Sequence, residues 1–170
     1  NAKARCIVVS STGPVFCAGI DIGMFGSDIA HTNDKNDPIY GAGFYQNVIR
    51  LQDALSSLEK CRIPVLAAIQ GGCYGGGVDL ITACDMRYGT DDSFITIYEI
   101  NVGMTADVGT FPRILNHMPE GIVRELAYTG RKMGAEELKS HGLYNATFAD
   151  HGAMMEHVMA TAKEIATKPP

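Results

Sequence analysis

The chain has 170 residues, of which 46% are hydrophobic and 19% are charged, a balance typical of one folded globular domain and not of a disordered segment. Its formal net charge is −5 and it has no run of basic residues, which argues against nucleic acid as a partner. No apolar stretch approaches the length of a membrane-spanning helix. The five cysteines are scattered and the five histidines are dispersed, which favours free thiols in a reducing compartment and indicates no metal site.

Apolar runs and helix-spaced apolar residues alternate along the chain. Strands are expected at residues 5–10, 64–69, 86–88, 93–97 and 144–148. Helices are expected at residues 44–61, 78–84, 106–115, 120–129, 134–141 and 151–166. A polar stretch marked by Pro and Gly, residues 27–41, is expected to be a surface excursion. The alternation of strands and helices predicts an α/β fold.

A glycine-rich segment from Gly71 to Gly77 is the most informative feature of the sequence. Five glycines fall within seven residues, and Asp79 follows two residues after the last of them. Glycine is used where the backbone takes unusual angles or where another group must approach it closely. Bare amide donors beside an acid suit chemistry on a carbonyl, because the amides hold a developing oxyanion and the acid moves a proton. The alternative is an ordinary turn, with Asp79 favoured only by the positive end of a helix.

Two other chemistries fit this segment less well. The phosphate-binding pattern GxxxxGK[ST] is absent, since no Lys, Ser or Thr directly follows Gly77, and the spacing of a dinucleotide-binding fingerprint is also wrong. Cys73 and Cys84 flank the segment, but no histidine lies near them in sequence to activate a thiol nucleophile. We therefore expect these cysteines to be buried structural thiols.

Three carboxylates, Asp79, Glu99 and Asp107, lie in weakly charged surroundings that contain apolar residues or glycine. Acids in such surroundings are either functional groups or ordinary caps. Asp107 could cap a helix running to Leu115, and Glu99 could face solvent at the end of a strand. All three acids lie close in sequence to the glycine-rich segment, which favours a functional role for them as a set.

Four segments carry a family resemblance. They are Phe16-Cys17-Ala18-Gly19-Ile20-Asp21, the apolar strand that leads into Gly75-Gly76-Gly77, Cys84-Asp85-Met86-Arg87, and the stretch from Glu99 to Gly109-Thr110. In type and in order, these segments resemble those of the crotonase, or enoyl-CoA hydratase/isomerase, superfamily over essentially the whole chain.

The resemblance implies a crotonase-like spiral of ββα turns. It implies that the backbone N–H groups of Ile20 and Gly76 form an oxyanion hole for the carbonyl of a coenzyme A thioester. The residues expected to contact the substrate beside them are Ala18, Gly19, Asp21 and Gly75. Coenzyme A is then part of the substrate, no metal or redox cofactor is required, and the chain is expected to assemble as trimers or dimers of trimers. The family's catalytic domain is longer, so residues 1–170 are expected to be a catalytic core without its first strands and its C-terminal oligomerisation helices.

The acids indicate a branch of the family. Hydratases carry Glu at the position of Asp79 and a small neutral residue at that of Asp107, so the chain departs from them at both. The three acids together resemble the set in the Δ3,5-Δ2,4-dienoyl-CoA isomerases of fatty-acid β-oxidation, which are mitochondrial and peroxisomal. That resemblance implies that Glu99 removes a proton from C2, that Asp107 adds one at C6, and that Asp79 orients Glu99. Two alternatives stay open: a 2-enoyl-CoA hydratase, and a non-catalytic crotonase-fold binding protein.

Overall fold

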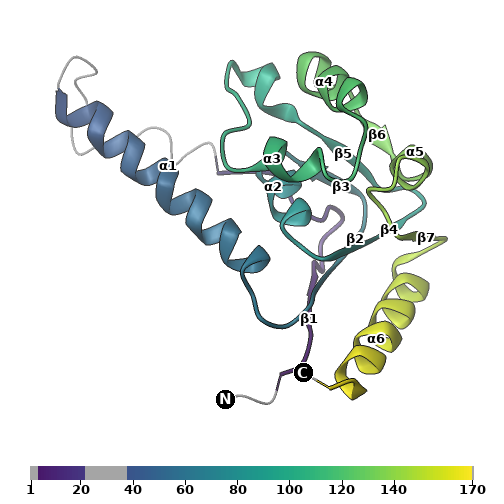
Figure 1. The fold of residues 1–170 in the computed structure, drawn as a ribbon. Helices are drawn as coiled ribbons and strands as arrows, with labels where there is room; N and C mark the ends of the chain where they lie inside the picture. The colour runs from purple at the N-terminus through teal and green to yellow at the C-terminus, as the bar shows by residue number, and fades with distance from the viewer. Residues whose placement is uncertain (1–3, 22–37, 170) are drawn as a thin grey trace.

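Two small β-sheets form the centre of the molecule (Figure 1). The computed structural model describes residues 4–21 and 38–169. The first sheet is parallel, in the order β1-β2-β4-β7, and consists of β1 (Ile7–Ser10), β2 (Val65–Ile69), β4 (Met86–Thr90) and β7 (Ala146–Phe148). The second has the order β3-β5-β6, with β3 parallel and β6 antiparallel to β5, and consists of β3 (Gly72–Tyr74), β5 (Phe94–Thr96) and β6 (Met133–Gly134).

From β2 to β5, successive strands alternate between the two sheets. β2 turns at Gly71, whose φ is +58°, into β3 and then into helix α2 (Gly76–Thr82). β4 leads in the same way into β5. The helical elements that follow are the 3-10 helix η2 (Tyr98–Val102), α3 (Thr110–Ile114) and α4 (Glu120–Thr129). The units β2-β3-α2 and β4-β5-η2 each place one strand in each sheet before a helical segment, as in the ββα turns that the family resemblance implies.

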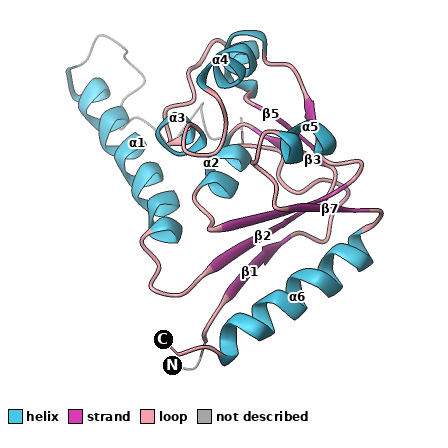
Figure 2. Cartoon of the chain, turned by 45° about the vertical axis from the view of Figure 1, so that its right-hand side comes forward, coloured by secondary structure: helices cyan, strands magenta, loops and turns pink. Residues whose placement is uncertain are grey.

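Strand β2 is buried along its whole length and has apolar side chains on both faces, as expected for a parallel strand covered on both sides. Val65, Ala67 and Ile69 belong to the larger core, between the sheets and the shorter helices. Leu66 and Ala68 belong to a second core, beneath helix α6 (His151–Thr167). The α6 residues in that core lie four apart on one face: Met154, Val158 and Ala162. Figure 2 shows α6 along one side of the four-stranded sheet and α2, α3 and α4 on the other.

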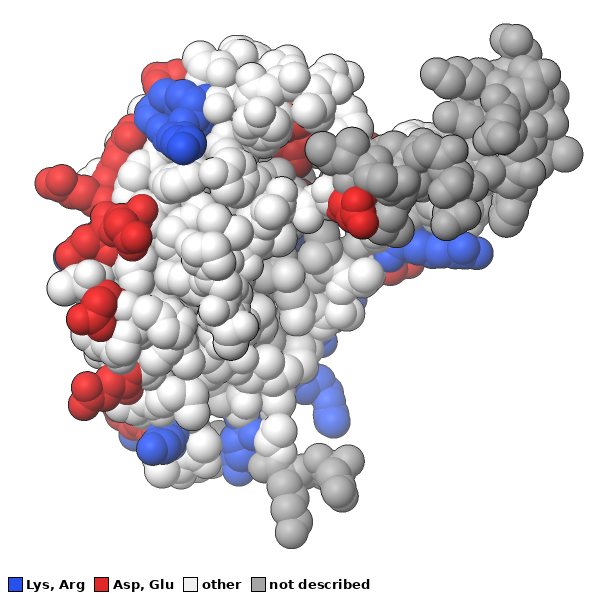
Figure 3. Space-filling view, turned by 180° about the vertical axis from the view of Figure 1, so that it is seen from behind, with Lys and Arg blue, Asp and Glu red and all other residues white. Residues whose placement is uncertain are grey.

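Two further helices complete the described chain. α1 (Pro38–Glu59) extends away from the sheets (Figure 1), and α5 (Ala135–Ser140) follows β6. None of the helices in the described part of the chain has the length and apolar character of a membrane-spanning segment. On the face drawn in Figure 3, acidic side chains gather along one edge, and Lys and Arg are scattered.

The predicted α/β alternation is confirmed, with local differences. The helix expected over 106–115 begins only at Thr110, because residues 107–109 form a turn and Gly109 has φ +121°. β3, inside the glycine-rich segment, and the two-residue β6 were not predicted. Most of the surface excursion expected over 27–41 lies outside the described residues, and its last four residues begin α1.

Candidate active site

The segment that leads to Ile20 is held against β3. A parallel bridge pairs Cys17 with Cys73, and the N–H of Tyr74 donates to the Cys17 carbonyl at 2.9 Å. A Cβ placed on Gly77 would lie 2.8 Å from Cβ of Cys17 and 2.9 Å from Sγ of Cys73, so this close packing requires glycine. The contacts bring the segment beside the first turn of α2.

Gly75 and Gly76 form the turn from β3 into α2. Gly75 has φ 48° and ψ −116°, a conformation that side chains rarely adopt, and its N–H donates to the Thr96 carbonyl at 3.0 Å. Gly76 is the first residue of α2, so its N–H has no acceptor one turn earlier in the helix. Among the described residues, and apart from its chain neighbours and its own helix backbone, no atom lies within 4 Å of a Cβ built on Gly76. This amide is therefore suited to receive an oxyanion, while its alignment with the Ile20 amide remains a prediction.

Glu99 lies in the first turn of η2 and is half-buried, so the alternative that it faces solvent at a strand end is wrong. Its Oε1 would lie 3.0 Å from a Cβ built on Gly75. Its Oε2 is buried and has no hydrogen-bond partner among the described residues. Burial raises the pKa of Glu99, and the negative charges of Asp79 and Asp107 raise it further. A carboxyl in this state beside the glycine turn is suited to exchange a proton with a bound substrate.

Asp79, on α2, is fully buried. Its Oδ1 accepts a hydrogen bond from Oγ1 of Thr110 at 2.8 Å, and its Oδ2 has no partner among the described residues. Burial raises the pKa of Asp79. The hydrogen bond from Thr110 and the charge of Arg113 oppose that rise, and the charge of Asp107 adds to it. Sequence reasoning missed Thr110, whose only signal was its place directly after Gly109.

Asp107 occupies a different environment from the other two acids. It lies in the turn before α3 and is exposed, and its backbone carbonyl accepts a hydrogen bond from Nε2 of Gln52 at 2.6 Å. The N-cap of α3 is Gly109, so the alternative that Asp107 caps this helix is wrong. The side chain of Asp107 does not line the cavity described below. Its charge nevertheless raises the pKa of both Asp79 and Glu99, so the three acids interact electrostatically.

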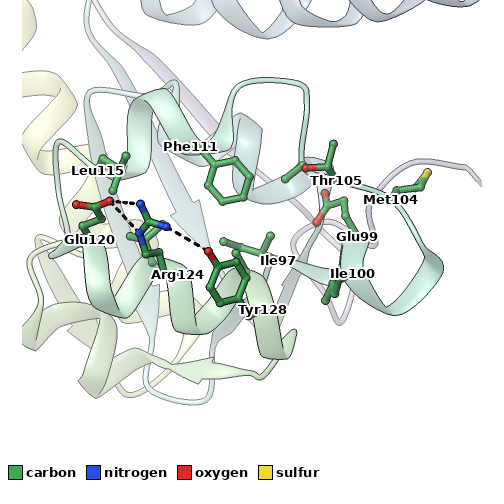
Figure 4. Close-up of a pocket in the computed structure, with 13 residues that line it drawn as sticks. Ile97, Glu99, Ile100, Met104, Thr105, Phe111, Leu115, Glu120, Arg124 and Tyr128 are labelled. Atoms are coloured by element: carbon green, nitrogen blue, oxygen red, sulfur yellow. Dashed lines mark hydrogen bonds and ion pairs between the residues drawn. The ribbon is translucent and has the colours of Figure 1, made fainter.

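An apolar cavity of about 430 Å³ opens between η2, α3 and α4. Figure 4 shows Glu99 at one end, Phe111 and Ile97 along the middle, and a polar group at the other end. In that group Arg124 donates to Oε1 of Glu120 through Nε at 2.8 Å, and to the Tyr128 hydroxyl at 3.2 Å. The other lining residues are Ile100, Met104, Thr105, Ala106, Leu115, Val123 and Ala127. The four-residue spacing of the polar group on α4 was visible in the sequence, but its place at one end of the cavity was not predicted.

The remaining predicted substrate residues lie at the end of the first described range, residues 4–21. Ala18 and Asp21 are exposed, and Gly19 and Ile20 are partly buried. Gly19 has φ +92°, and a Cβ there would lie 3.4 Å from the Tyr74 carbonyl oxygen. Within the described residues, no group of three or more His, Cys, Asp or Glu side chains could hold a metal ion.

The whole chain, residues 1–170, matches the family model described as enoyl-CoA hydratase/isomerase. A mitochondrial Δ3,5-Δ2,4-dienoyl-CoA isomerase of Homo sapiens is 41% identical over 175 residues, which cover 100% of this chain and 52% of the human protein. A peroxisomal protein of the same name from Arabidopsis thaliana is 36% identical over 171 residues, which cover 100% of this chain and 62% of that protein.

Among solved structures, a proposed enoyl-CoA hydratase from Thermobifida fusca YX in complex with CoA has a TM-score of 0.85 at 25% identity, covering 97% of this chain and 63% of that one. The chain spans about half the length of the first curated relatives it matches, 52% in the human case. The expected crotonase fold is confirmed by these likenesses. The chain therefore belongs to the enoyl-CoA hydratase/isomerase family.

Proposed function

We propose that this protein is a Δ3,5-Δ2,4-dienoyl-CoA isomerase, which converts a 3,5-dienoyl-CoA to a 2,4-dienoyl-CoA. The observation that carries the proposal is the Glu99 carboxyl, which has a raised pKa and lies between the Gly75 turn and an apolar cavity. The relatives of that name, at 41% and 36% identity over the whole chain, support the same reaction.

The reaction begins with removal of a proton from C2 of the substrate by Glu99. The negative charge that develops spreads from the thioester oxygen along the conjugated chain to C6. The N–H groups of Ile20 and Gly76 would hold that oxygen, and each donor of this kind contributes about 3 kcal/mol. Burial of Glu99 favours the protonated product of this step, because a raised pKa makes the carboxylate a stronger base.

The second step adds a proton at C6, which is too far along the acyl chain from C2 for one carboxyl to serve both positions. We assign this step to Asp107, which directly follows two lining residues of the cavity, Thr105 and Ala106. Asp79 completes the group. Because neighbouring carboxylates resist being ionised together, Asp79 helps to keep the pKa of Glu99 raised.

One observation favours a second candidate function, the hydration of a 2-enoyl-CoA. Asp107 is exposed, which leaves Asp79 and Glu99 as the buried pair that would hold the attacking water. The two functions differ in product: isomerisation extends conjugation with the thioester, whereas hydration removes it.

The proposal extends to partners and place of action. The substrate is an acyl-CoA thioester, no metal or redox cofactor is required, and the chain acts as the catalytic core of a homotrimer or a dimer of trimers. Location in mitochondria or peroxisomes follows the named relatives.

The test is the ultraviolet spectrum of the full-length protein with a 3,5-dienoyl-CoA and, separately, with a 2-enoyl-CoA. The proposal expects the absorbance of a conjugated 2,4-dienoyl thioester to appear with the first substrate, and to be lost in Glu99→Gln. Loss of enoyl absorbance with the second substrate, without any change in the first, would establish the hydratase instead.

A further inference from the structure

Arg113 of α3 makes a set of directed contacts outside the cavity. Its side chain is only 9% exposed, and its Nε lies 3.0 Å from Oε2 of Glu59. Its Nη2 donates to Oγ of Ser56 at 2.9 Å, and its Nη1 donates to the carbonyl of Val108 at 3.5 Å. The guanidinium thus joins α1 to the turn that follows Asp107.

One face of α1 supplies the other half of these contacts. Gln52, Ser56 and Glu59 have the four- and three-residue spacing of neighbours on a helix surface. Gln52 donates through Nε2 to the Asp107 carbonyl at 2.6 Å. Two successive carbonyls of the turn, those of Asp107 and Val108, therefore each accept a hydrogen bond from a side chain.

Gly109 makes room for the guanidinium in this arrangement. A Cβ at this position would overlap Nη1 of Arg113, and φ of Gly109 is +121°. The guanidinium therefore occupies the space that a side chain at residue 109 would take. The pair with Glu59 is open to water, since that carboxylate is 57% exposed, and exposed pairs of this kind add little stability. The contacts therefore act more on geometry than on stability.

We propose that Arg113 is a positioning residue that, together with Gln52 of α1, holds the turn presenting Asp107 beside the cavity. The inference rests on the proposed function, because it assigns the position of the acid that protonates C6. Two parts of the site are then held by different elements. Glu99 is held by η2 and the Gly75 turn, and the turn that carries Asp107 is held by α1 through Arg113 and Gln52.

The variant that tests this is Arg113→Lys, which keeps the positive charge near Asp79 but cannot make the three contacts of a planar guanidinium. In the full-length protein, formation of 2,4-dienoyl-CoA is expected to fall at least about tenfold, since small misplacements of a reacting group have large effects. Exchange of the C2 proton with solvent deuterium, which uses Glu99 and the proposed oxyanion hole but not Asp107, is expected to stay within about twofold. Arg131→Lys is the matched control, because Arg131 pairs with Glu125 and Glu137 and does not line the cavity; neither activity should change.

Parallel loss of both activities in Arg113→Lys, or loss of neither, would overturn the inference. A second readout is independent of catalysis: amide hydrogen exchange over residues 107–110 should become faster in Arg113→Lys and in Gln52→Ala. Unchanged exchange in that turn would also overturn it. A wild-type protein that forms no 2,4-dienoyl-CoA would instead refute the proposed function, and the hydrogen-exchange result would still decide whether Arg113 holds the turn.

Discussion

Replacing Gly75 with Ala tests whether the Glu99 carboxylate works from its place beside the glycine turn. The added Cβ would lie 3.0 Å from Oε1 and 3.5 Å from Cδ of Glu99, so the carboxylate must move by a few tenths of an ångström. Gly75 also has φ +48°, so the same substitution strains the backbone. Gly103→Ala is the control, because Gly103 has φ +71° and a Cβ there would meet none of the described residues within 4 Å apart from its chain neighbours.

Both substitutions strain the backbone, and the strain is larger at Gly75, whose ψ is −116°, than at Gly103, whose left-handed conformation has ψ 24°; the contact with Glu99 arises only at Gly75. A side chain held at such backbone angles costs about 1–3 kcal/mol, so both variants should have a lower free energy of unfolding and a lower unfolding temperature than the wild type. Only Gly75→Ala displaces Glu99. Because a misplacement of about 1 Å can cost about 10²-fold in rate, a shift of a few tenths of an ångström should slow C2 proton exchange about tenfold.

The assay is deuterium incorporation at C2 of a 3,5-dienoyl-CoA by the full-length variants, measured below their unfolding transitions. Gly75→Ala is expected to exchange the C2 proton about tenfold more slowly than wild type, because the Glu99 carboxylate is displaced. Gly103→Ala is expected to exchange it at the wild-type rate. Equal exchange in both variants would show that Glu99 does not remove the C2 proton from the position described above.

Three further changes probe the acids. Asp107→Asn should lower 2,4-dienoyl-CoA formation by about 10²–10⁴-fold and leave C2 exchange in place; unchanged product formation would remove Asp107 from the mechanism. Burial raises the pKa of Asp79 above its ordinary 3.8, so the folded protein binds this proton more tightly than the unfolded one, and the free energy of unfolding falls as pH rises through the folded-state pKa. Asp79→Asn should therefore show a smaller fall in denaturant-measured stability than wild type as pH rises above 3.8, the ordinary pKa of Asp, and an equal fall would contradict the raised pKa. Thr110→Val removes the hydrogen bond to Asp79 and should cost about 1–3 kcal/mol, with the larger loss at the higher pH; a loss independent of pH would place the effect in packing alone.

Local patterns in the sequence were sufficient to predict the strands of the four-stranded sheet and the helix that covers it. The continuous apolar run of β2 and the four-residue spacing of Met154, Val158 and Ala162 each reflect burial on a definite face, so they predict the element without its neighbours. The start of α3 was predicted wrongly because the sequence 106–109 has helix-compatible residues, and only the φ of +121° at Gly109 excludes the helix.

The candidate site was predictable where local sequence determines it and not where tertiary packing does. The glycine-rich turn, Asp79 and Glu99 were identified from their neighbours in the chain. The exposure of Asp107 was not, because its turn is set by contacts with α1, and Arg113 reaches Glu59 and Ser56 across 54 and 57 residues of sequence. The cavity likewise combines residues of η2, α3 and α4, which no single segment reveals.

The central claim is that one proton leaves C2 and another arrives at C6. Its most direct test is the reaction of the full-length protein with a 3,5-dienoyl-CoA in deuterium oxide, followed by nuclear magnetic resonance of the product. The account predicts a 2,4-dienoyl-CoA that carries deuterium at C6. A product without deuterium at C6, or one with a solvent-derived hydroxyl at C3, would contradict it.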